Sequence, residues 1–464
     1  MYKLLMIWRY FLKKRIALIA VAAVALVVMM VLVVLSIMSG LVEDNRRRNH
    51  DWVGDLVIKS NSLVGFPYYN EFLTELENHD QVTAAAPIIK TFGLLAHVEE
   101  MVELYGVDLE SWCTVTNFAD TLHYQPENGL PSFVIQGNNL LTDEQKHHGC
   151  ITGIYLILHS FTNSMSKKNR PLLENLGVDQ KGFAEMPVTV LGLTSRGTLA
   201  TDLGERRIFR YVNDSDTGLV EIDRTAIYVD FKQLQQLCWM DGADSNPPRT
   251  SEIRIKLKDR INLETGRTQI TTAWNEFVRK KQGQPAAFLL DNTIVEDWKQ
   301  YRRSSIAPME REKTMMIALF GMIAVVAVFI VVAIFYMIVT EKIKDLGIIK
   351  SVGGSNWSVG QIFLGYGLLV GIIGATLGAT LGCAVVWNSN QIESGVSAIY
   401  TSFGWGDFHL WDPDVYAIER IPDVVNLPEA AIIALVAVLA SIIGAALPAR
   451  RAAQLEVVET LRVE

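Results

Sequence analysis

The stretch that decides the fold is Glu341–Ser358, with the sequence EKIKDLGIIKSVGGSNWS. It lies between two apolar segments, residues 313–340 and 359–387, and each is long enough to cross a bilayer, which takes about 20 residues. A charged segment this short, held between two membrane spans, cannot form a domain of its own. We interpret residues 341–358 as a cytoplasmic coupling segment, which a protein outside the membrane can grip.

Two further apolar stretches, residues 16–40 and 428–448, bring the predicted transmembrane helices to four. The first is longer than the core of a signal peptide, which has about 7–15 residues, so we expect it to be retained. The chain of 464 residues is 50% hydrophobic and yet 20% charged, which indicates membrane spans combined with a large polar domain. The net charge of −8 gives no reason to expect binding to nucleic acid.

The lysines and arginines predict the orientation, because they accumulate on the cytoplasmic side of membrane spans. With four crossings, the basic groups within residues 1–15, 341–358 and 449–464 fall on one side, which we take as cytoplasmic. Residues 1–15 are then an interfacial helix, and residues 449–464 form a cytoplasmic tail. Residues 41–312 and 388–427 are exported. The three arginines at 46–48 oppose this orientation, but long domains translocate largely regardless of charge.

The exported residues 41–312 predict an α+β domain. Alternating apolar and polar residues in GDLVIKS (54–60) and SEIRIKLKD (251–259) are typical of strands, and residues 262–281 have apolar residues at helical spacing. The length favours two subdomains. One would combine Asp51–Ser111 with Ser251–Leu290, and a β-rich one, Trp112–Arg249, would be inserted into it. A helical stalk over Asp297–Lys313 would lead into the second span.

Two exported stretches are open to two interpretations each. Ser160–Gly177 is polar and basic and contains proline, so it is predicted to be a protruding loop, either a hook that docks a partner or an ordinary solvated loop. Residues 388–427 mix aromatic and acidic residues, as in FGWGDF (403–408). Aromatic residues at a membrane boundary favour interfacial anchoring, and guiding a lipid chain is the alternative.

Three cysteines, Cys113, Cys150 and Cys238, fall in the exported part, and Cys383 lies in the third span. An oxidising compartment could join one pair of the three in a disulfide. Alternatively, all are small buried residues.

The third span carries a glycine repeat. Gly374, Gly378 and Gly382 recur every four residues and therefore share one face of a helix. Small faces allow helices in lipid to approach closely, so we expect this face to pack against another helix.

No catalytic residues, metal site or bound cofactor are expected on this chain. The sequence contains no GxxxxGK[ST], GxSxG or HExxH motif, and no cluster of histidine, cysteine or acidic residues with metal spacing. An ion-coupled carrier usually needs ionisable groups inside its spans, and the apolar stretches 16–40, 314–340, 359–387 and 430–448 contain no acidic or basic residue. Energy would therefore enter through the coupling segment.

The coupling segment suits that role physically. Its lysines would hold it at the cytoplasmic face, its aliphatic side chains would fill a groove on the partner, and two adjacent glycines would end its helix. A solvated loop is the alternative. The candidate ATPase-coupling residues are Glu341, Lys342, Lys344, Asp345, Leu346, Gly347, Ile348, Lys350, Gly353, Gly354 and Ser355.

Two stretches resemble the FtsX-like permease family of ABC systems. The first is Val339–Ser355, VTEKIKDLGIIKSVGGS, which departs from the family at Asp345, where glutamate is usual, and at Gly354, where alanine is frequent. The second is Pro448–Arg462, PARRAAQLEVVETLR, where Val457 replaces the usual proline. Three further stretches are similar to the lipoprotein-releasing (LolC/LolE-type) branch: WRY (8–10) with LSIMSG (35–40), EKTMM (312–316) and DVYAIERIP (414–422).

The resemblance implies a non-catalytic permease subunit of the bacterial inner membrane, with a MacB-like exported domain. Its partners would be a cytoplasmic ABC ATPase dimer that binds ATP and Mg²⁺, a second permease, identical or homologous, and a lipoprotein that is passed to a periplasmic carrier. ATP would drive release by mechanical transmission through the coupling segment. Two alternatives are an FtsX-type regulator of a cell-wall hydrolase and a MacB-like exporter of peptides or small molecules.

Overall fold

The chain divides into two compact units, which are described one at a time. The membrane unit draws on Met1–Asp44, Ala307–Trp411 and Glu419–Glu464, and the inserted domain on Asn45–Ile306. The structure is a computed structural model that describes residues 15–96, 98–125, 131–135, 142, 146–162, 166–175, 184–200, 204–242, 246–341, 348, 350–351, 355–404 and 420–454. Residues 1–14 of the predicted interfacial helix and most of the C-terminal tail lie outside these ranges.

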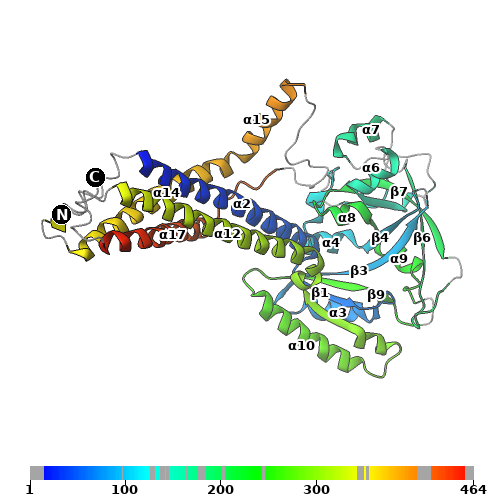
Figure 1. Cartoon of the computed structure of the whole chain (residues 1–464). Helices are drawn as coiled ribbons and strands as arrows, with labels where there is room; N and C mark the ends of the chain where they lie inside the picture. The colour runs from blue at the N-terminus through cyan, green and yellow to red at the C-terminus, as the bar shows by residue number, and fades with distance from the viewer. Residues whose placement is uncertain are drawn as a thin grey trace. The chain divides into compact units, whose positions relative to one another are not determined.

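Four helices in the described chain are long and apolar enough to cross a membrane, as expected from the sequence. They are α2 (Arg15–Val53), α12 (Arg303–Glu341), α14 (Asn356–Trp387) and α17 (Leu427–Gln454), and a shorter helix, α15 (Ser389–Ser402), follows α14 (Figure 1). Helices α2 and α12 extend beyond their apolar segments. Their outer ends, Asn45–Val53 and Arg303–Ile306, belong to the inserted domain.

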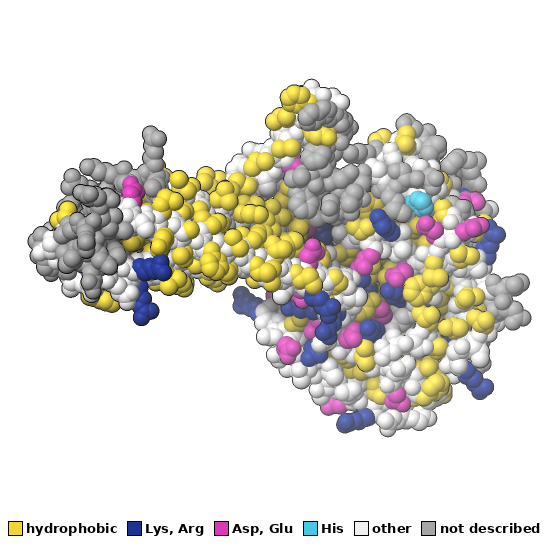
Figure 2. Space-filling model, in the orientation of Figure 1, with side chains coloured by type: hydrophobic (Ala, Val, Ile, Leu, Met, Phe, Trp, Pro, Cys, Tyr) yellow, Lys and Arg dark blue, Asp and Glu magenta, His cyan; other side chains and the backbone are white. Residues whose placement is uncertain are grey.

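The membrane unit is hydrophobic on its outside as well as between its helices. Val28, Phe335 and Val370 are buried in one cluster that joins the four long helices. Met322 and Phe329 of α12 are 65% and 69% exposed, and hydrophobic side chains cover the bundle in the space-filling view (Figure 2). A helix that is apolar on all sides is typical of a membrane span.

The glycines of α14 bring this helix into close contact with two neighbours. A Cβ atom at Gly378 would lie 2.5 Å from the carbonyl oxygen of Ala25, and Gly374 and Gly382 face α2 in the same way. On another face, a Cβ atom at Gly367 would lie 2.5 Å from that of Ala445 in α17. The glycine repeat that the sequence singled out therefore faces α2.

The inserted domain is built on one sheet of nine strands, in the order β11-β1-β10-β3-β4-β8-β5-β7-β6. The pairs β4–β8 and β5–β7 are parallel, and the other pairs are antiparallel. The strands are β1 (Leu56–Ser60), β3 (Val82–Leu95), β4 (Glu100–Val107), β5 (Gly149–Gly153), β6 (Glu185–Val190), β7 (Glu205–Ser215), β8 (Ala226–Asp230), β10 (Glu252–Leu257) and β11 (Thr293–Asp297). Strands β2 (Phe66–Pro67) and β9 (Arg249–Thr250) form a separate pair.

Strand β3 closes part of this sheet into a barrel. It pairs with β10 through Val82–Ile88 and with β6 through Gly93–Leu95, while β4 occupies its other edge. The strands β3, β4, β8, β5, β7 and β6 therefore form a hydrogen-bonded ring. Gly93 lies at the closure, where a Cβ atom would be 2.7 Å from side-chain carbons of both Leu104 and Val188.

Helices cover both faces of the sheet. The short helices are α3 (Tyr69–Glu77), α4 (Leu109–Val115), α6 (Ile154–Thr162), α7 (Arg170–Asn175), α8 (Val220–Thr225), α9 (Phe231–Leu237) and α11 (Trp298–Tyr301), and α10 is longer (Leu263–Lys281). Helices α3 and α10 lie side by side (Figure 1), joined by edge-to-face packing of Phe72 on Trp274 at 4.7 Å. On the other face, Trp52, Tyr105 and Tyr228 form a second core.

The two predicted subdomains are the two parts of this single sheet. The outer segments supply β1, β3, β4 and β10, and the segment Trp112–Arg249 supplies β5 to β8, which join the rest through the β4–β8 and β3–β6 pairs. Strand β11 lies beyond the predicted end of the outer segments at Leu290. The predicted stalk is helical in two pieces, α11 and the start of α12, separated at Arg302.

The stretch Ser160–Gly177 contains more helix than the predicted loop. Its described residues form the end of α6, a turn of 3₁₀ helix at Lys167–Asn169, and α7. The helical turns are fixed by ion pairs, because Arg170 binds Asp214, which is buried, and Lys167 binds Asp216. Residues 163–165, 176 and 177 lie outside the described ranges.

Candidate functional site

Only part of the coupling segment is described. Glu341 is the last residue of α12, Ile348 is helical with 57% of its surface exposed, and Ser355 caps the N-terminus of α14 by accepting a hydrogen bond from the Ser358 amide at 3.2 Å. The other candidate coupling residues, Lys342, Lys344, Asp345, Leu346, Gly347, Gly353 and Gly354, lie outside the described part of the chain.

The described residues place the coupling segment beside the end of α17. The Lys350 ammonium donates to the backbone carbonyl of Ala453 at 2.9 Å. Beneath it, Val339, Val359 and Ala449, from α12, α14 and α17, are buried together. Lys350 therefore contacts the end of α17 where α12, α14 and α17 pack together.

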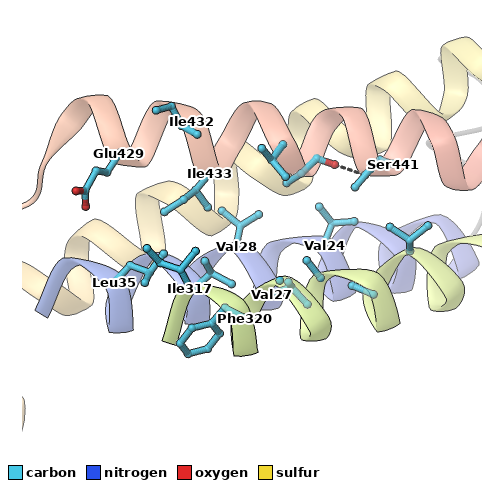
Figure 3. Close-up of a pocket in the computed structure, with 18 of the residues that line it drawn as sticks. Val24, Val27, Val28, Leu35, Ile317, Phe320, Glu429, Ile432, Ile433 and Ser441 are labelled. Carbon is cyan, nitrogen blue, oxygen red and sulfur yellow. Dashed lines mark hydrogen bonds between the residues drawn. The ribbon is translucent and has the colours of Figure 1, made fainter. Parts of the chain in front are cut away.

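The membrane unit contains an apolar groove between α2, α12 and α17 (Figure 3). Its volume is about 360 Å³, which lies within the range of about 300–1,000 Å³ common for small-molecule sites. Most of the lining is aliphatic, with side chains such as Val28, Ile317 and Val436. A groove of this composition can hold a hydrocarbon chain, because burying each CH₂ group contributes about 0.8 kcal/mol.

One end of this groove is polar. The carboxylate of Glu429, in the first turn of α17, accepts a hydrogen bond from the Ser39 hydroxyl at 2.8 Å. It also forms an ion pair with the Lys313 ammonium at 3.1 Å. We call these three residues the polar cap. They tie together α2, α12 and α17, the same three helices that line the groove.

The inserted domain holds a buried arginine where its two membrane helices enter it. Arg254 of β10 is fully buried, and its guanidinium lies 4.4 Å from the ring centre of Trp52 and 4.8 Å from that of Trp112. It donates to the Trp52 carbonyl at 2.8 Å, near the end of α2, and pairs with Glu252. The Tyr301 hydroxyl, just before α12, donates to Glu252 at 2.8 Å. We call this cluster the arginine joint.

A polar cleft of about 390 Å³ opens beside the arginine joint. Each of its three cationic residues is ion-paired: Lys59 with Glu296, Lys90 with Glu103, and Arg302 with Glu221. Arg302 also donates to Asn49 of α2 at 2.6 Å. Because these charges are balanced by their neighbours, the cleft adds further links between α2 and the start of α12.

The inserted domain also buries a carboxyl group, Asp223 in α8. Its Oδ1 accepts hydrogen bonds from the amide and hydroxyl of Thr217 at 3.1 and 2.9 Å, while Oδ2 has no hydrogen-bond partner among the described residues. Burial raises the pKa of Asp223 to about 7, and the nearby Asp216 carboxylate adds to the rise. Its bonds to Thr217 and the charge of Lys167 oppose this shift.

Asp223 predicts a pH-dependent stability. Because the folded state holds this proton more tightly than the unfolded chain, Asp223 contributes stability at pH 4 that is lost as the pH rises through 7. In the wild type, we expect Asp223 to lower the free energy of unfolding by about 2–4 kcal/mol as the pH rises from 4 to 8. Asp223→Asn should lack this decrease and be more stable than the wild type at pH 8. Thermal unfolding of both proteins in detergent, between pH 5 and 8, measures this. Parallel profiles for the two would contradict it.

All four cysteines lie in the described part of the chain, and all four are free thiols. Cys150 and Cys238 are packed in the core of the inserted domain. Burial raises the pKa of the Cys113 thiol to about 11 and that of Cys238 to about 12. Cys150 and Cys238 are thus buried thiols, as one of the two interpretations has it, whereas Cys113 and Cys383 are only partly buried.

Sequence reasoning missed the polar cap and the arginine joint. Lys313 and Glu429 stand at the ends of two predicted spans, where charged residues are ordinary, and only the fold brings them together. Arg254 occupies one position of an alternating strand, a pattern that predicts a solvated side chain. The described residues hold no group of three metal-ligating side chains.

The C-terminal part of the chain is similar to an FtsX-like permease domain. Residues 317–457, which include α14, α17 and most of α12, match the family model described as FtsX-like permease C-terminal. The resemblance drawn from the coupling segment and from the C-terminal motif is thereby confirmed.

The curated relatives that match this chain are named as transmembrane proteins of lipoprotein-releasing systems. The lipoprotein-releasing system transmembrane protein LolC of Xylella fastidiosa (strain Temecula1) is 29% identical over 249 residues, 54% of each chain. LolC of Neisseria meningitidis serogroup B is 27% identical over 277 residues, 60% of each chain. LolE of Haemophilus influenzae is 26% identical over 149 residues, 32% of this chain and 34% of that protein. The chain thus spans little more than half the length of the LolC proteins it matches.

Among solved structures, the periplasmic region of MacB from Actinobacillus actinomycetemcomitans matches 57% of this chain and 97% of that chain. The identity is 11% and the TM-score is 0.28.

Proposed function

We propose that this chain is a permease subunit of an ABC transporter complex that releases lipoproteins from the outer leaflet of a bacterial inner membrane. The observation that carries the proposal is the apolar groove between α2, α12 and α17, which suits acyl chains. The names of the LolC and LolE relatives support the same substrate class. The chain itself would be non-catalytic, and ATP with Mg²⁺ would be bound by a separate ATPase.

The proposed orientation places both termini and residues 341–358 in the cytoplasm. The inserted domain is then periplasmic, and so is the segment after α14 that contains α15. This follows from the positions of the basic residues around the four spans. The polar cap would then lie toward the periplasmic side of the groove.

In the proposed mechanism, the acyl chains of a lipoprotein enter the groove from the lipid, and no substrate crosses the bilayer. A cytoplasmic ATPase dimer closes when it binds ATP and presses on the coupling segment. Helix α12 runs without a break from Arg303 to Glu341, the first residue of the coupling segment, so it can pass on the movement. A second permease, identical or homologous, would complete the site, and a periplasmic carrier would accept the lipoprotein.

The proposal is tested by reconstituting the complex in proteoliposomes with its ATPase and a triacylated lipoprotein. We expect ATP to move the lipoprotein onto a soluble carrier, and a non-hydrolysable ATP analogue to support no repeated transfer. A complex that hydrolyses ATP and binds a cell-wall hydrolase without moving any lipoprotein would contradict the proposal and favour the FtsX-type regulator.

The coupling segment gives a second test, at Ile348. This side chain is largely exposed, so introducing a charge there should leave the fold of the membrane unit intact. We expect Ile348→Glu to lose the ATPase in co-purification, because a buried unpaired carboxylate would disfavour the contact by several kcal/mol. Ile392→Glu is the matched control, an exposed isoleucine of α15 that the proposed topology places on the opposite side. Retention of the ATPase by Ile348→Glu would count against the assignment.

A further inference from the structure

We infer that the polar cap binds the polar group at the end of the bound acyl chain, its head, and selects an uncharged amide over a carboxylate or an ammonium. The inference rests on the proposed function, since it assumes that the groove holds acyl chains. It adds a recognition role for Lys313, Glu429 and Ser39, which the comparisons do not assign.

The first observation is where the charges lie. Of the side chains that line the groove, all within the described residues, only Lys313 and Glu429 are charged, and they are paired with each other. In the close-up, Glu429 lies near Leu35 and Ile317 at one end of the groove, while Ser441 lies toward the other end (Figure 3). A chain that fills the apolar part therefore has its head at the pair.

The second observation is that the pair is partly withdrawn from water. The Lys313 side chain is 26% exposed and that of Glu429 is 34% exposed. In such a setting an unbalanced third charge is costly, because desolvated ions need nearby partners. A carboxylate head would be repelled by Glu429, and an ammonium head by Lys313.

An amide head can instead insert between the two residues and satisfy both. Its N–H group donates to Glu429 Oε1, and its carbonyl oxygen accepts from the Lys313 ammonium, so each ion keeps a hydrogen bond and no net charge is added. Lys313 has a long flexible side chain that can move aside. Glu429 is more firmly held, because Ser39 continues to donate to Oε2 at 2.8 Å and the start of α17 favours a negative charge.

The binding test uses the purified full-length chain in nanodiscs and a fluorescent hexadecanoyl probe. Three competitors share one chain length: N-methylhexadecanamide, hexadecanoate and hexadecylammonium. We expect the amide to displace the probe at a concentration about tenfold lower than the other two, since only the amide forms a hydrogen bond with each ion without adding a third charge.

Two variants should shift the preference in opposite directions. Glu429→Gln leaves Lys313 without its counter-ion, so hexadecanoate should become the strongest competitor. Lys313→Met leaves Glu429 unbalanced, so hexadecylammonium should become the strongest. The neighbours Glu312 and Arg311 are exposed on α12 and do not line the groove, so Glu312→Gln and Arg311→Met are matched controls that should keep the amide preference.

The outcomes separate the two proposals. Equal displacement by all three competitors on the wild-type chain would overturn the role of the polar cap and leave the acyl groove standing, whether or not the variants fold. If the probe does not bind, or if Ile317→Trp, at an exposed residue that lines the groove, does not weaken its binding, the acyl groove itself fails. A wild-type amide preference that both variants shift as described would support the inference.

Discussion

Arg254→Ala is expected to lower the free energy of unfolding of the inserted domain by about 3–5 kcal/mol, the cost of breaking a buried ion pair on one side. The loss has two sources. Glu252, which is 5% exposed, would be left as a charge without its cation. The guanidinium also lies over Trp52, Trp112 and Tyr301, and desolvated contacts of this kind contribute about 2 kcal/mol.

Urea unfolding of the full chain in detergent, followed by tryptophan fluorescence, measures this effect because Trp52 and Trp112 lie in the joint. Arg279→Ala is the matched control, since Arg279 is exposed on α10, and it should change stability by less than about 0.5 kcal/mol. Arg254→Lys should fall between the two, because an ammonium keeps the charge but loses the planar stacking. A loss below about 1 kcal/mol for Arg254→Ala would show that the ion pair and ring contacts of Arg254 do not stabilise the inserted domain as expected.

Gly378→Leu is expected to prevent α14 from packing against α2 and to leave little folded membrane unit. Even the Cβ atom of alanine would lie 2.5 Å from the Ala25 carbonyl oxygen and 2.8 Å from the Val28 Cβ atom. Both neighbours are in or next to the backbone, so neither can move aside cheaply. Overpacking costs about 1–3 kcal/mol for small additions, and the whole leucine side chain must find space here.

The measurement is the fraction of solubilised protein that stays monodisperse after heating, for Gly378→Leu, Gly378→Ala and Gly360→Ala. Gly360 belongs to the same helix, and a Cβ atom there has its nearest neighbour at 4.0 Å, so alanine should be tolerated. We expect stability to fall in the order Gly360→Ala, Gly378→Ala, Gly378→Leu. Equal stability of all three would show that α2 and α14 are not in the close contact described.

The membrane spans could be predicted from the sequence because a span is a local property. A run of about 20 apolar residues must cross the bilayer or be buried, whatever the rest of the chain does. The glycine repeat was predictable for the same reason, since helical spacing alone places Gly374, Gly378 and Gly382 on one face. Which helix they face depends on the fold, and the sequence left that open.

The barrel and the arginine joint could not be predicted in this way, because both join distant segments. The pairing of Gly93–Leu95 with Val188–Val190 depends on the closure of six strands, and no local pattern marks it. In the joint, the outward side of β10 is covered by aromatic rings from Trp52, Trp112 and Tyr301, which come from three separate segments. The polar cap has the same origin, since Lys313 and Glu429 are 116 residues apart.

The ring of strands in the inserted domain has a mechanical consequence. In a closed ring every strand is hydrogen-bonded along both edges, so no strand can peel away without breaking two ladders at once. A load applied along such strands is resisted in shear by many hydrogen bonds together, whereas an open edge would unzip one bond at a time. The six strands of the ring should therefore stay together under load, whereas β11, which is paired only with β1, has a free edge and should separate first.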